Sequence, residues 1–75
     1  MSTQIPSADY DILVTDAATG RVLATDVVDA GSGRHAAQIA VRRVDDADID
    51  GAAEPQLIVT APDGEQTTYT FAEAR

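Results

Sequence analysis

The segment SGRHAAQIAVRRV, residues Ser32 to Val44, decides the fold, because within it the spacing of the apolar residues changes from that of a strand to that of a helix. From Arg34 onward the apolar residues fall within one arc of a helical wheel, which predicts an amphipathic helix. Ser32 is suited to cap its first turn. The small side chains on the arc would let the helix lie close to a sheet. The arc consists of Ala36, Ala37, Ala40, Val41 and Val44.

The chain before this helix has the pattern of a β-hairpin. Residues 10–15 alternate between apolar and polar side chains, which is typical of a half-buried strand. The turn at residues 16–20 contains Asp16, which can bond to the turn backbone, and Gly20, which can adopt positive φ. Residues 21–28 then predict the returning strand.

A second hairpin is predicted after the helix. Residues 45–55 form an acidic loop, and residues 56–61 predict a strand. Pro62, Asp63 and Gly64 follow as a strong turn sequence, and residues 65–71 return.

These elements predict an α+β fold of order β-β-α-β-β. The simplest way to bury their apolar sides is a four-stranded antiparallel sheet with one helix packed on one face. We expect residues 1–8 to form a flexible N-terminal tail, residues 9–71 a single domain, and residues 72–75 a frayed C-terminal end.

The composition restricts the classes of function. The chain has 75 residues, no Cys, and a net charge of −8 from 13 acidic and 5 basic side chains. This balance disfavours nucleic-acid binding, which requires clustered positive charge. Without a long apolar run or a secretory signal pattern, we expect a cytoplasmic protein that does not bind membranes. A GC-rich genome or a high-salt habitat would also explain the acidity.

Two groups of residues are candidates for protein contacts. Leu13 and Ile58, with Val22 and Val28 in one register of their strand, are predicted on the sheet face opposite the helix. Apolar residues on neighbouring strands can form a dimer surface, and a core this small leaves little stability to spare, so we expect a homodimer.

The helix offers the second group. Arg34, His35, Arg42 and Arg43, with Ile39 partly exposed among them, could form a small docking patch for an acidic partner. The helix dipole is an alternative explanation for Arg42 and Arg43, because they lie in the last turn of the helix. Arg34 lies at the opposite end and has no such explanation.

One motif suggests a metal. Asp46, Asp48 and Asp50, followed by Gly51, resemble the first half of an EF-hand-type calcium loop. The resemblance ends there, since Leu57 occupies the position of the bidentate Glu. We expect at most weak calcium binding.

No catalytic residues or cofactors are predicted. His35 is the one side chain whose ordinary pKa lies near neutrality, and no nucleophile or orienting acid accompanies it in the local sequence. The sequence therefore favours a small acidic, non-enzymatic protein-interaction or regulatory module. We expect it to self-associate, and its protein partner is not identified by the sequence. The alternatives are a weak calcium-binding domain and an acidic nucleic-acid mimic that blocks a DNA-binding protein.

Overall fold

Two antiparallel hairpins form the sheet in the computed structural model, which describes residues 7–74. β1 (Ala8–Asp16) pairs with β2 (Arg21–Ala30), and β3 (Pro55–Thr60) pairs with β4 (Gln66–Thr70). The turns between them contain Gly20 and Gly64 at φ of 74° and 94°, values that favour glycine. Both turns were predicted from the sequence.

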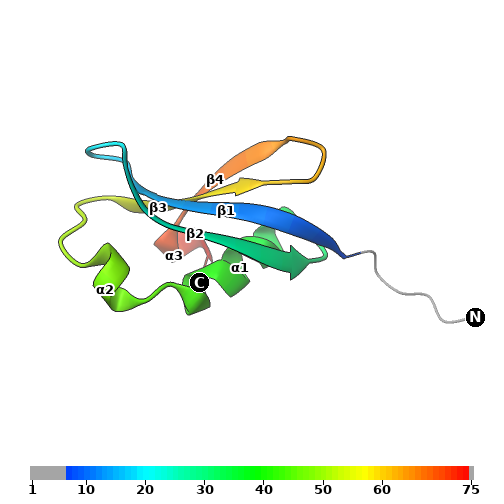
Figure 1. Cartoon of the computed structure of the whole chain (residues 1–75), viewed down its shortest axis with the longest axis horizontal. Coiled ribbons are helices and arrows are strands. Elements are labelled where there is room, and N and C mark those ends of the chain that lie inside the picture. Colours follow the sequence, from blue (N-terminus) through cyan, green and yellow to red (C-terminus); the bar gives the residue numbers. More distant parts are fainter. Residues whose placement is uncertain (1–6, 75) are drawn as a thin grey trace, which may run out of the picture.

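The central strands join the hairpins. β1 and β3 pair antiparallel, so that the sheet order is β2-β1-β3-β4 (Figure 1). This confirms the predicted α+β class with a four-stranded antiparallel sheet. The edges of the sheet are therefore β2 and β4.

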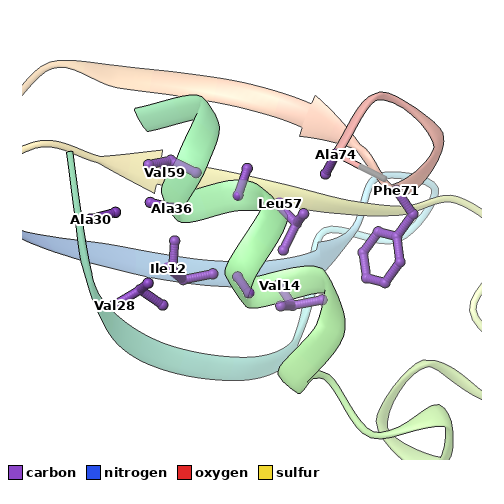
Figure 2. Packing of buried hydrophobic residues seen from close by; sticks show 11 residues of the cluster. Ile12, Val14, Val28, Ala30, Ala36, Leu57, Val59, Phe71 and Ala74 are labelled. Atoms are coloured by element: carbon purple, nitrogen blue, oxygen red, sulfur yellow. The ribbon is translucent and has the colours of Figure 1, made fainter. Parts of the chain in front are cut away.

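The predicted central helix is α1 (Gly33–Arg43), and it packs across one face of the sheet. Ser32 is its N-cap, and its hydroxyl accepts the backbone N–H of His35 at 3.1 Å. Figure 2 shows the buried side chains between α1 and the sheet. The largest that are fully buried are Val14, Val28, Leu57 and Val59. Ala36, Ala37 and Ala40 face them, and their small size brings the helix backbone close to the sheet.

A β-bulge interrupts the first hairpin. Val14 pairs with Ala24 and Thr15 with Val22, which leaves Leu23 as an extra residue on β2. Side chains that pair directly share a sheet face. The bulge therefore changes which residues of β2 face the helix on its two sides.

Two short helices correct the sequence-based expectation. The predicted loop at residues 45–55 contains α2 (Asp46–Ile49). α3 (Phe71–Ala74) begins at the last residue of the predicted strand and extends into the expected frayed end, residues 72–75. α3 buries Phe71 and Ala74 in the core beside α1, so this end of the domain is packed rather than frayed.

The predicted N-terminal tail, residues 1–8, lies mostly outside the part of the chain that the structure describes. Of the predicted N-terminal tail, residues 1–6 lie outside the described residues, and β1 begins at Ala8. No helix within residues 7–74 has the length and apolar character needed to cross a membrane.

Candidate interaction site

Leu13 and Ile58 lie side by side on the sheet face opposite α1. They are direct cross-strand partners on the two central strands, and both are half-buried. Val27, on the neighbouring row of the same face, is 54% exposed. The sequence placed Leu13 and Ile58 on this face, and the register brings them together at its centre.

The surroundings of this pair carry few charges. Alternation along the strands and direct pairing assign the remaining residues to this face. Among the paired strand residues within 7–74, its charged members are Asp9, Asp11 and Asp29, all at one end. The uncharged members beside the Leu13–Ile58 pair are Thr15, Val22, Thr25, Val27, Gln56, Thr60, Gln66, Thr68 and Thr70. We call Leu13, Ile58 and these uncharged neighbours the open face.

The open face is shallowly hollowed. A depression of about 340 Å³ lies beside Leu13 and is walled by Thr25, Val27 and Thr60, and its lining also includes the acidic residues Asp11 and Asp26. These side chains form a surface that combines apolar groups with threonine hydroxyls, and the hydroxyls can donate or accept hydrogen bonds. The arrangement can contact another protein surface.

Val22 lies on the open face and Val28 lies on the opposite face, so the expectation that placed both on one face was wrong. Val28 pairs with Tyr10 and is 1% exposed in the core, whereas Val22 pairs with Thr15 and is 53% exposed. The bulge at Leu23 separates them and reverses the alternation.

The second predicted group is divided by the structure. Ile39 packs against the core, so it adds little to an exposed patch. Arg34 is exposed at the start of α1. The pKa of Glu73 in α3 is lowered chiefly by the backbone N–H and the hydroxyl of Thr70, and the charge of Arg34 adds to this effect. At the other end of α1, Arg43 forms an ion pair with Asp26 of β2, with 3.1 Å between Nε and Oδ2.

The three predicted metal ligands are not gathered into a ligand group. Asp46 and Asp48 lie in α2, and Asp50 follows as its C-cap. A helical turn replaces the extended loop in which alternating carboxylates converge on calcium. Over residues 7–74, no cluster of three or more His, Asp or Glu side chains is arranged to hold a metal ion.

The best-bonded carboxylate is one that the sequence indicated only as a turn residue. Asp16, at the end of β1, is 6% exposed and accepts the backbone N–H groups of Ala18, Ala53 and Glu54 at 3.0, 3.3 and 3.1 Å. The N–H of Ala18 is the main cause that lowers the pKa of Asp16. The other two N–H groups and the Thr19 side chain add to it, while burial opposes them. Its role is structural, since it joins the first turn to the segment before β3.

Comparison with protein-family models, with curated proteins and with solved structures finds no significant match for this chain.

Proposed function

We propose that the protein is a small non-enzymatic interaction module that self-associates through the open face. One observation carries this proposal: in a chain of net charge −8, the neighbours of the Leu13–Ile58 pair on the open face are uncharged except at the end where Asp11 lies. Interface cores are poor in charged residues and contain apolar anchors, which matches this composition.

The charge distribution favours a second copy as the occupant. Two copies at −8 repel each other over most of their surfaces. The open face lets them approach with little repulsion, because its charged end at Asp9, Asp11 and Asp29 can lie away from the same end of the partner in a two-fold arrangement. Two sheets stacked in this way lie about 10 Å apart.

The size of the face limits the surface area that a dimer can bury. Three rows of residues across four strands cover about 400 Å² in projection. Stable complexes bury about 800 Å² of accessible surface on each partner, so we expect a dimer that dissociates on dilution. Its formation would add apolar burial to a domain whose own core is small.

Sedimentation velocity over a range of protein concentrations tests this proposal. The average mass of the natural protein should rise toward that of a dimer, and Ile58→Asp should stay monomeric. His35→Asp is the matched control, since it adds the same charge at an exposed position on α1 and should dimerise like the natural protein. A natural protein that remains monomeric at every concentration would refute self-association.

A module of this kind is expected in the cytoplasm. Localisation of the tagged full-length protein in its own cell checks this part of the proposal.

A further inference from the structure

The outer edge of β4 has unused backbone hydrogen-bonding groups. The Ala61 N–H donates to the Glu65 carbonyl at 2.8 Å, which continues the register of the β3–β4 pair. Because hydrogen-bonded pairs alternate in an antiparallel ladder, Thr67 and Tyr69 bond toward β3. Gln66 and Thr68 consequently direct their N–H and C=O groups away from the sheet.

The two sheet edges differ in their protection against added strands. β2 carries Asp26 and Asp29 and is distorted by the bulge at Leu23. Charges and bulges are the usual means of blocking an edge. β4 contains no charged residue and no bulge within Gln66–Thr70. It is therefore the edge at which another strand can pair.

A polar hollow of about 340 Å³ lies beside this edge, on the helix side of the sheet. Tyr10 and Tyr69 line it together with Asp63 and Glu65 of the β3–β4 turn. Gly33, at the start of α1, closes one wall, where an added Cβ would lie 3.8 Å from the Tyr69 hydroxyl. Aromatic rings and carboxylates around one space attract a cation through ring faces and charge.

We propose that β4 accepts an extended basic segment of a partner protein as a fifth strand, with an Arg or Lys side chain in this hollow. A residue placed opposite Thr67 shares its face, and Thr67 itself lines the hollow. The backbone bonds to Gln66 and Thr68 supply the pairing, and the hollow supplies the preference for a basic side chain. This binding goes beyond self-association, because it uses the backbone edge of β4 and the hollow on the helix side of the sheet rather than the side chains of the open face.

Charge argues against a second copy at this edge. If two β4 strands paired antiparallel about Thr68, Glu65 of each copy would lie near Phe71 and Glu73 of the other. The turn and α3 thus place carboxylates at both ends of β4. Like charges at both ends would oppose that pairing, whereas a basic segment would be attracted.

The test uses the full chain and a short, end-blocked peptide of alternating Thr and Val with a central Arg. Binding is followed by fluorescence anisotropy, and the pairing by amide hydrogen exchange. The Arg peptide should bind and slow exchange at Gln66 and Thr68. Replacing its Arg by Glu, or its Val residues by Pro, should abolish binding. Absence of binding up to about 1 mM Arg peptide, or equal binding of the Pro-containing peptide, would overturn the proposal.

Variants of the protein separate the pairing from general charge attraction. Glu65→Arg should weaken binding about tenfold or more, because it places a positive charge in the hollow. Glu54→Arg makes the same charge change at an exposed position outside the hollow and should leave the affinity within about twofold. Equal losses in the two variants would overturn the proposed site.

Thr68→Pro tests the edge itself. It removes an N–H that points away from β3, a position at which an edge strand tolerates proline. The circular dichroism spectrum should be unchanged and peptide binding lost. Ile58→Asp should still bind the peptide, so a failure of self-association and a failure of this site give different results. Unchanged peptide binding by a folded Thr68→Pro variant would refute strand addition.

Discussion

The Asp16 carboxylate accepts the backbone N–H of Glu54 at 3.1 Å, although 38 positions separate the two residues. The same carboxylate accepts the N–H of Ala18 in its own turn. One side chain therefore holds the end of the first hairpin against the entry to the second. Without the carboxylate, these partly buried N–H groups would lose their hydrogen-bond acceptor, and this loss would lower the stability of the fold.

Replacing this carboxylate should destabilise the domain. We expect Asp16→Asn to lower the Tm and Asp16→Ala to lower it further, by several degrees, because alanine leaves the N–H groups of Ala18, Ala53 and Glu54 without their acceptor. Thermal unfolding followed by circular dichroism measures the change. Asp9→Asn is the matched control, since Asp9 is exposed, and its Tm should match that of the natural protein. Equal Tm values for all four proteins would contradict the structural role of Asp16.

Acid should weaken the domain through the same carboxylate. The folded-state pKa of Asp16 is lowered, chiefly by the Ala18 N–H, and that of Glu73 is lowered by the N–H and hydroxyl of Thr70. A lowered folded-state pKa contributes stability that is fully present above the ordinary carboxyl pKa, about 4, and is lost as the pH falls through the folded-state value. Urea unfolding from neutral pH to about pH 3 measures it. The difference in stability between the natural protein and Asp16→Asn should shrink toward low pH, and a constant difference would contradict the lowered pKa.

The main elements could be predicted because their signals are local. Ser32 before an apolar helical arc, and glycines in two polar turns, specify the boundaries of α1 and the hairpins without reference to distant residues. The side of the sheet on which Leu13 and Ile58 lie followed from alternation along their strands. In each case, neighbouring residues contained the information.

The misses have two different causes. α3 had a usable signal, because Thr70 and Glu73 have the spacing of a capping box. The bulge at Leu23 and the bonds from Asp16 to Ala53 and Glu54 depend on contacts between distant segments, for which the local sequence contains no pattern.

The capping box should be needed for α3. The Thr70 hydroxyl accepts the Glu73 N–H at 3.1 Å, and the Glu73 carboxylate accepts the Thr70 N–H at 2.9 Å. Thr70→Ala removes one of these bonds and should cost about 1 kcal/mol of unfolding free energy. Thr70→Ser keeps the hydroxyl and should retain most of the stability. Urea unfolding measures both variants, and faster amide exchange at Ala74 should accompany the loss in Thr70→Ala. Equal stability of the Ala and Ser variants would contradict the cap.

Val22 and Val28 provide a paired test of the bulge, since both are valines on β2 and both would change to alanine. Val28 is 1% exposed between α1 and the sheet, so Val28→Ala removes buried methyl groups and should cost about 2 kcal/mol. Val22 is 53% exposed, and Val22→Ala should change the stability by at most about 0.5 kcal/mol. Without the bulge, residues 22 and 28 would alternate onto one face and the two costs would be alike. Urea unfolding of the two variants therefore measures whether Leu23 is the extra residue, and similar costs would place the register shift elsewhere on β2.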